Sequence, residues 1–138
     1  MDKIIINKKL DSLYRCIKRI EDKCPANASE LKTNIDLQDV IVLNLSRAVQ
    51  LCVDIAAHSL TNSSQPVPNT MSETFQRLAE QNLISSHLAD RLKKSVGFRN
   101  LAVHNYHDLN WDIVFAVASK HLEDFKEFAK NISAITNS

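Results

Sequence analysis

Residues 37–56, LQDVIVLNLSRAVQLCVDIA, decide the fold class that this sequence predicts. Their apolar side chains recur at spacings of three and four residues, which is the period of an α-helix. They cover more than one stripe of that helix, at Leu37, Val40, Ile41, Leu45, Val49, Cys52, Val53, Ile55 and Ala56. We therefore expect a long helix over about residues 29–60, with its apolar excess in a deep core or, as we favour, at a subunit interface.

The sequence on both sides of this segment is helical as well. Gly97 is the only glycine, and the three prolines, Pro25, Pro66 and Pro68, fall between apolar segments. Residues that punctuate hairpins are therefore scarce. The apolar spacing predicts further helices over about residues 3–22, 70–82, 85–97 and 111–132, with a polar loop over 61–69. The prediction is an all-α, up-and-down bundle of about five helices that forms one domain over residues 1–138.

Short polar signals mark where two of these helices begin. Thr70 and Glu73 form a Thr-x-x-Glu capping box, in which the threonine hydroxyl accepts a hydrogen bond from a free backbone N–H. Asp108 and Asn110 precede the last apolar segment, and either side chain is a suitable N-cap. We expect a helix to start at each place.

Length and composition restrict the class of protein. A chain of 138 residues suits one domain, and its 17 Lys and Arg nearly balance its 16 Asp and Glu. This balance argues against a general electrostatic nucleic-acid binder. The three cysteines show no zinc spacing and are expected to be free thiols. Because no signal-peptide core or run of about 18 apolar residues is present, we expect a soluble, cytoplasmic protein with no membrane partner.

The array Arg99-x4-His104-x-Tyr106 is the strongest candidate for chemistry. An arginine is a permanent cation whose planar fork matches phosphate oxygens, and a histidine exchanges protons near neutral pH. On one straight helix, residues five apart are rotated by roughly 140°, so Arg99 and His104 would not share a face. A bend at Gly97, fraying of the helix after His104, or the long reach of the arginine would let the three groups converge on one ligand. A dimer that sets two arrays against each other is a second possibility.

These groups suit metal-independent cleavage of RNA, in which a ribose 2′-hydroxyl attacks the adjacent phosphorus. His104 would act as the general base or acid and Arg99 would stabilise the charge on the phosphate. Basic residues before the array, Arg91, Lys93 and Lys94, predict a local positive patch. We expect no cofactor and no metal ion. Asp54 and His58 lie four apart and would share a helix face, but no second carboxylate is spaced to complete a metal site.

The array resembles the signature of HepT-type toxins, which are helical-bundle nucleases of the HEPN superfamily. Gly97 and Phe98 precede it, and a helix that opens with Trp111 follows it. The resemblance extends to residues 44–56, to the loop that contains Pro66, and to the Phe75-x-x-Leu78 helix. It therefore covers almost the whole chain.

The resemblance implies a homodimeric ribonuclease toxin of a type VII toxin–antitoxin system, with a composite site at the subunit interface. Its partner would be a minimal nucleotidyltransferase antitoxin, MntA, that transfers AMP to the tyrosine of the signature. Carried over to this chain, Arg99 and His104 would be catalytic and Tyr106 would be the AMP acceptor. Asn100 would border the cleft.

Several readings stay open on the sequence alone. His107 and Lys94 are possible further contacts to RNA, although a turn histidine and a solvated lysine are the commoner cases. Asp54 could orient a residue of the array across the bundle instead of binding a metal. The alternative function is a non-catalytic module that binds a nucleotide or the transferase and serves assembly.

Overall fold

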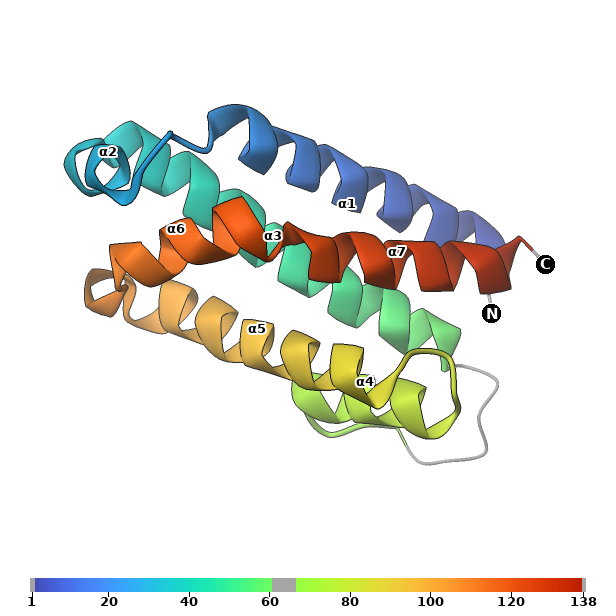
Figure 1. The fold of residues 1–138 in the computed structure, drawn as a ribbon. Coiled ribbons are helices and arrows are strands. Elements are labelled where there is room, and N and C mark those ends of the chain that lie inside the picture. The colour runs from blue at the N-terminus through green and yellow to red at the C-terminus, as the bar shows by residue number, and fades with distance from the viewer. Residues whose placement is uncertain (1, 61–66, 138) are drawn as a thin grey trace.

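The computed structural model describes residues 2–60 and 67–137. Within these residues the chain forms α-helices and one short 3₁₀ turn, without a strand: α1 (Lys3–Lys23), α2 (Ala28–Thr33), α3 (Ile35–Ser59), α4 (Met71–Glu80), α5 (Ser86–His104), η1 (Tyr106–Asp108), α6 (Trp111–Lys120) and α7 (Leu122–Thr136). The long helices α1, α3, α5 and α7 run side by side, and both termini lie at one end of the bundle (Figure 1). The predicted all-α bundle is confirmed.

The long helix expected over residues 29–60 is interrupted at Asn34. Asn34 has an extended backbone (φ −124°, ψ 100°), and its side chain accepts a 3.1 Å hydrogen bond from the backbone N–H of Leu37. Asparagine is among the best N-cap residues, so it opens α3 here and separates it from α2. The amide of Gln38 holds the two pieces together, because its Nε2 donates to the carbonyl of Leu31 at 2.9 Å.

The last predicted helix is also two helices. At His121 the backbone leaves the helical region (φ −112°, ψ 10°), which ends α6 at Lys120 and starts α7 at Leu122. The second piece runs on to Thr136, beyond the expected end near residue 132. Because residue 121 is not a strong N-cap residue, the sequence predicts one continuous helix across this break.

Helix α3 is the central helix of the bundle. It contacts each of the other six α-helices in the described part of the chain. Nearly all its apolar side chains are therefore buried inside one copy, and Ile35 and Leu43 are its exposed large apolar residues. The central position accounts for the apolar excess that we had favoured as a subunit interface, so α3 itself gives no support for one.

By length and composition alone, α3 would also be long and apolar enough to cross a membrane. In the bundle, 56% of its most apolar window is buried against other helices. A helix that is apolar on most sides belongs either to a membrane or to the middle of a core. The packing of α3 places it in the second class.

The core is continuous through the bundle and contains no disulfide among the described residues. Phe75 of α4 and Phe128 of α7 are fully buried and meet edge to face with ring centroids 6.1 Å apart. The thiols of Cys16, Cys24 and Cys52 are free, as expected. Burial raises the pKa of the Cys52 thiol well above its ordinary value, so this side chain acts as a small apolar core residue.

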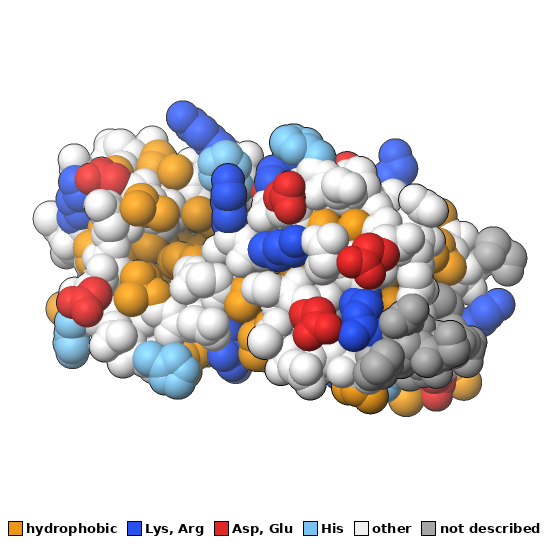
Figure 2. Space-filling model, turned by 90° about the horizontal axis from the view of Figure 1, so that it is seen from below, with side chains coloured by type: hydrophobic (Ala, Val, Ile, Leu, Met, Phe, Trp, Pro, Cys, Tyr) orange, Lys and Arg blue, Asp and Glu red, His pale blue; other side chains and the backbone are white. Residues whose placement is uncertain are grey.

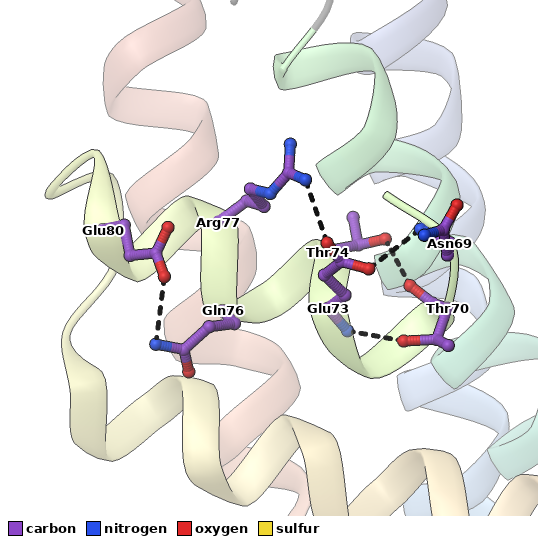
Figure 3. A network of polar contacts seen from close by, with 7 residues as sticks. All are labelled: Asn69, Thr70, Glu73, Thr74, Gln76, Arg77 and Glu80. Atoms are coloured by element: carbon purple, nitrogen blue, oxygen red, sulfur yellow. Dashed lines mark hydrogen bonds and ion pairs between the residues drawn. The ribbon is translucent and has the colours of Figure 1, made fainter. Parts of the chain in front are cut away.

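The start of α4 confirms the predicted capping box. The hydroxyl of Thr70 accepts from the backbone N–H of Glu73 at 3.0 Å, and the Glu73 carboxylate accepts from the N–H of Asn69 at 2.9 Å (Figure 3). The same carboxylate pairs with Arg77 one turn later at 2.9 Å. These bonds lower the pKa of Glu73, led by the one from Asn69. The part of the predicted loop over residues 61–66 lies outside the described residues.

Candidate functional site

Helix α5 ends at the histidine of the array. The helix runs without interruption through Gly97, and a Cβ added there would meet no atom within 4 Å. Asn105 then leaves the helical region (φ −141°, ψ 57°), while its N–H still donates to the carbonyl of Leu101 at 2.8 Å. The helix therefore continues past the expected end at residue 97 and stops after His104, where we expect fraying, with no interruption at Gly97.

Arg99 and His104 lie on different sides of α5. By helical period, Arg99 lies within roughly 20° of the stripe that carries the buried Leu92, so it emerges at the edge of the bundle. Its Nη1 donates to Oδ1 of Asn100 at 3.2 Å. His104 is exposed. In the described part of the chain, no hydrogen bond joins the arginine to the histidine, as the 140° rotation predicted.

Tyr106 stands in the 3₁₀ turn η1, at the end of the bundle opposite to both termini (Figure 1). Its hydroxyl donates a 2.8 Å hydrogen bond to Oδ1 of Asp39, which comes from the second turn of α3. The ring of Trp111, the first residue of α6, meets the phenol ring at a steep angle with centroids 5.8 Å apart. The tyrosine is thus held from two elements and is only partly exposed.

This environment raises the pKa of Tyr106 to about 12. The largest cause is burial of the phenol, followed by its hydrogen bond to Asp39 and the negative charge of that carboxylate. Each of these favours the neutral phenol over the phenolate. At neutral pH the side chain therefore carries its proton.

Asp39 is the site residue that sequence reasoning missed. The sequence offers Asp54 as an acid that could orient a residue of the array across the bundle. Asp54 instead accepts from Gln50 at 3.0 Å and lies 3.6 Å from the ammonium of Lys9. Asp39 and Tyr106 are 67 residues apart, and no local motif connects them. Only the antiparallel packing of α3 and α5 reveals the pair.

The expected positive patch is smaller than the sequence suggested. Arg91 is bound by two acids of α7, since its Nε lies 2.6 Å from Asp124 and its Nη2 lies 2.9 Å from Glu127. Lys93 contacts Gln76 and lies 3.7 Å from Asp90. Lys94 is exposed. Of these three cations before the array, Lys94 is the one with no ion pair among the described residues.

A cleft of about 380 Å³ opens beside the array rather than at it. Apolar side chains such as Phe98, Ile113 and Val117 line it, together with Arg91 and Lys94. Arg99, His104 and Tyr106 are not among its lining residues. This cleft and the residues of the array are therefore neighbours that do not coincide.

Exposed apolar side chains surround the array. Leu101 and Val103 of α5 are 37% and 54% exposed, and Ile113 of α6 is 56% exposed. Figure 2, which views the bundle from below, shows hydrophobic side chains gathered on one half of that face, with basic and histidine side chains around them. Such a patch beside polar functional groups is typical of a surface that another molecule covers.

The surroundings of Tyr106 include aromatic neighbours but no cluster of metal ligands among the described residues. Among residues 2–60 and 67–137, no group of three His, Cys, Asp or Glu side chains is placed to hold a metal ion. His107 is exposed in η1, with its ring at 86° to that of Tyr106 and 6.3 Å away. Trp111 packs against the core and also touches the tyrosine.

The comparisons with known proteins agree on one family. The model of the family described as "Ribonuclease HepT-like" matches residues 13–132. The mRNA nuclease HepT of Shewanella oneidensis is 45% identical over 134 residues, which are 97% of this chain and 99% of the relative. The tRNA nuclease HepT of Aphanizomenon flos-aquae is 22% identical over 97% of this chain and 91% of its own.

A solved structure shows the same fold in a complex. The tri-AMPylated HEPN toxin of Shewanella oneidensis, bound to its MNT antitoxin, superposes with a TM-score of 0.89 at 43% identity. The match covers 97% of this chain and 99% of that one. These findings confirm the predicted family, its ribonuclease class and its kinship with toxins that have antitoxin partners. The chain belongs to the HepT-like ribonuclease family of HEPN toxins.

Proposed function

We propose that this chain is the cytoplasmic toxin of a type VII toxin–antitoxin pair, acting as one domain over residues 1–138. It cleaves RNA without a metal ion, and an MntA-type nucleotidyltransferase silences it by attaching AMP to Tyr106. The observation that carries the proposal is the placement of Arg99, His104 and Tyr106 around the exposed end of α5. In this chain those residues form the same signature that first suggested the family.

The cleavage step uses the two residues of α5. His104, exposed at the helix end, removes the proton of the ribose 2′-hydroxyl or delivers one to the leaving 5′-oxygen. A positioned acid or base contributes roughly 10²–10⁴ in rate. The guanidinium of Arg99 binds the phosphate oxygens as negative charge develops on them. Asn100, whose amide oxygen holds this guanidinium, positions it.

A homodimer would place an arginine and a histidine opposite each other, which one copy does not do. Arg99 and His104 are rotated apart on α5, whereas a second copy facing this end would bring another arginine and histidine opposite them. The exposed apolar side chains Leu101, Val103 and Ile113 border the array and suit such a contact. Two histidines, one from each copy, then share the base and acid roles. Higher assembly with the antitoxin builds on this dimer.

The proposed switch acts by charge and bulk. A nucleotide on Tyr106 stands two residues from His104 and adds a phosphodiester anion to the site. This anion competes with the RNA phosphate for Arg99, and the nucleoside fills the approach to the cleft. Because Asp39 and Trp111 hold the phenol in place, the adduct stays at the site rather than swinging into solvent.

RNA is the proposed substrate class. The relatives are named for cleaving mRNA and tRNA, and the overall charge of +1 gives this chain little general affinity for nucleic acid. Local contacts between the RNA and residues near the array must then supply the binding. Lys94, which has no ion pair among the described residues, and the exposed His107 are the proposed additional contacts.

Cleavage of a defined RNA in excess chelator tests the proposal. We expect Arg99→Ala and His104→Ala each to lower the rate by at least about 100-fold, and Arg99→Lys to restore little, because a lysine lacks the planar fork. The matched controls are Arg15→Ala and His87→Ala, which change exposed residues away from the array and should cleave at the wild-type rate. Cleavage that persists in both array variants contradicts the proposed roles.

A further inference from the structure

We propose that Asp39 is the general base for the modification of Tyr106. In this step, which rests on the proposed function above, the carboxylate takes the phenolic proton while the phenol oxygen attacks a nucleoside triphosphate. The toxin therefore brings part of the catalytic machinery for its own inactivation. The partner transferase holds the nucleotide, and α3 of the toxin holds the base.

The geometry places the base directly on the reacting atom. Oδ1 of Asp39 accepts from the Tyr106 hydroxyl at 2.8 Å, which is within the range of a strong O–H···O hydrogen bond. Asp39 is exposed, and no ion pair to it is found in the described part of the chain. Because the residue is exposed, a proton taken from the phenol can pass from the carboxylate to water.

A base is needed because the phenol does not ionise by itself near neutral pH. With a pKa of about 12, only about one Tyr106 in 10⁵ is a phenolate at pH 7. A neutral phenol is a weak nucleophile, so its proton must leave as the new bond forms. Protein kinases meet the same need with an aspartate that accepts the proton of the substrate hydroxyl.

The proposed step transfers an adenylate from ATP to the phenol and releases pyrophosphate. The Tyr106 oxygen forms a bond to the α-phosphorus of ATP, and the bond from that phosphorus to the bridging oxygen of pyrophosphate breaks. Pyrophosphate leaves with the electron pair of the broken bond. The phenolic proton passes to the carboxylate of Asp39 and then to water. The products are the tyrosine phosphodiester of AMP and pyrophosphate.

Other titratable groups near the phenol are less well placed. His107 and Asp108 share η1 with Tyr106, His104 ends α5, and Asp112 of α6 is paired with a lysine of α2 at 3.0 Å. Within the described residues, none of these four is hydrogen-bonded to the Tyr106 hydroxyl. Asp39 is the group that receives its proton.

The rate of modification tests the assignment. Purified toxin is mixed with ATP and the cognate nucleotidyltransferase in excess, and addition of the first adenylate is followed by intact mass. Asp39→Asn keeps an oxygen that can accept from the phenol but removes the base, so we expect a loss of at least about 100-fold. The control is Asp36→Asn, an exposed acid one turn earlier in α3, which should react at the wild-type rate.

The pH dependence separates a base from a mere support. In Asp39→Asn, the phenol must ionise before it reacts, so the rate should rise about tenfold per pH unit between pH 7 and 9. The wild-type rate should change little over the same range. Asp39→Glu, which restores a carboxylate, should recover most of the rate. Circular dichroism confirms that each variant is folded before the rates are compared.

The outcomes distinguish this assignment from the proposed function. If wild-type protein gains no adenylate at Tyr106, the proposed modification is wrong and the assignment falls with it. If Asp39→Asn is modified as fast as wild type, the base is wrong while the modification stands. A slow Asp39→Asn whose rate does not depend on pH also overturns the base, since it indicates a positioning role only.

Discussion

The hydroxyl of Tyr106 and the carboxylate of Asp39 meet at 2.8 Å across the end of the bundle, from elements 67 residues apart in the chain. This bond ties the short turn η1 to α3, which contacts the other six α-helices. The residue proposed as the switch is therefore anchored to the central helix of the bundle. The hydrogen bond to Asp39 and the ring contact with Trp111 fix this side chain of the turn from two helices.

The titration of Tyr106 is the first prediction. We expect its phenol to ionise with a midpoint of about 12 in the folded protein, against an ordinary value of 10. Because the pKa is raised, the contribution of the neutral phenol to stability is complete below pH 10 and is lost as the pH rises through 12. The difference in absorbance between wild type and Tyr106→Phe measures this midpoint. Asp39→Asn should lower it, and an unchanged midpoint contradicts the contact.

Removal of the acceptor hydroxyl is the second prediction. Tyr106→Phe keeps the ring against Trp111 but has no oxygen to attack a nucleotide, so we expect no adenylate on the protein. Cleavage of RNA should stay within a few-fold of wild type, and growth inhibition should no longer be relieved by the transferase. Tyr14→Phe, which changes an exposed tyrosine of α1, is the control. An adenylate found on Tyr106→Phe would place the modification elsewhere.

Gly97→Ala is the third prediction. The glycine lies inside α5, and an added Cβ meets nothing within 4 Å. Alanine is favoured over glycine in a helix interior by about 0.8–1 kcal/mol, so the variant should unfold at a higher denaturant concentration. Urea unfolding followed by circular dichroism measures the change. A monomeric Gly97→Ala variant that unfolds at a lower urea concentration than wild type would contradict the open space around Gly97.

The main helices follow from the sequence because they depend on local patterns. Helix α1 and the Thr70 cap of α4 are read from spacing and cap residues alone. The breaks at Asn34 and His121 are not, because the apolar period continues across both. Asn34 carries a local N-cap signal that the apolar period outweighed, and His121 carries no side-chain cap.

The site shows the same division between local and tertiary information. Arg99, His104 and Tyr106 lie within eight residues and are visible as one motif. The rotation of Arg99 relative to His104 follows from the helical period, because both residues lie on α5. The partner of the tyrosine is a tertiary fact, since many exposed acids in the sequence are equally plausible. Asp54 was considered for this reason, although it pairs with Lys9.

The aromatic pair in the core gives the fourth prediction. Phe128 is fully buried and packs edge to face on Phe75 at 6.1 Å. Phe128→Ala should lower the free energy of unfolding by about 3–5 kcal/mol, because it removes a large apolar side chain and leaves a cavity. Leu43→Ala, at a half-exposed position of α3, should cost much less. Equal losses in the two variants contradict the packing described here.

The proposed dimer gives the fifth prediction. Ile113→Asp places a charge in the exposed apolar surface beside the array and should convert a dimer to a monomer. Light scattering after gel filtration gives the mass, and RNA cleavage should fall together with dimer content. Ile4→Asp, 70% exposed in the first turn of α1 at the opposite end of the bundle, is the matched control. An active monomer of Ile113→Asp excludes a composite site on this surface.

The central claim is that Arg99 and His104 cut RNA by attack of the 2′-hydroxyl, and that AMP on Tyr106 stops them. The most direct measurement is single-turnover cleavage of one RNA in chelator, by unmodified protein and by the same protein after modification, with analysis of the product ends. We predict 2′,3′-cyclic phosphate ends from the unmodified protein and a loss of at least about 100-fold after modification. Equal rates before and after modification, or products without cyclic phosphate ends, would contradict this account.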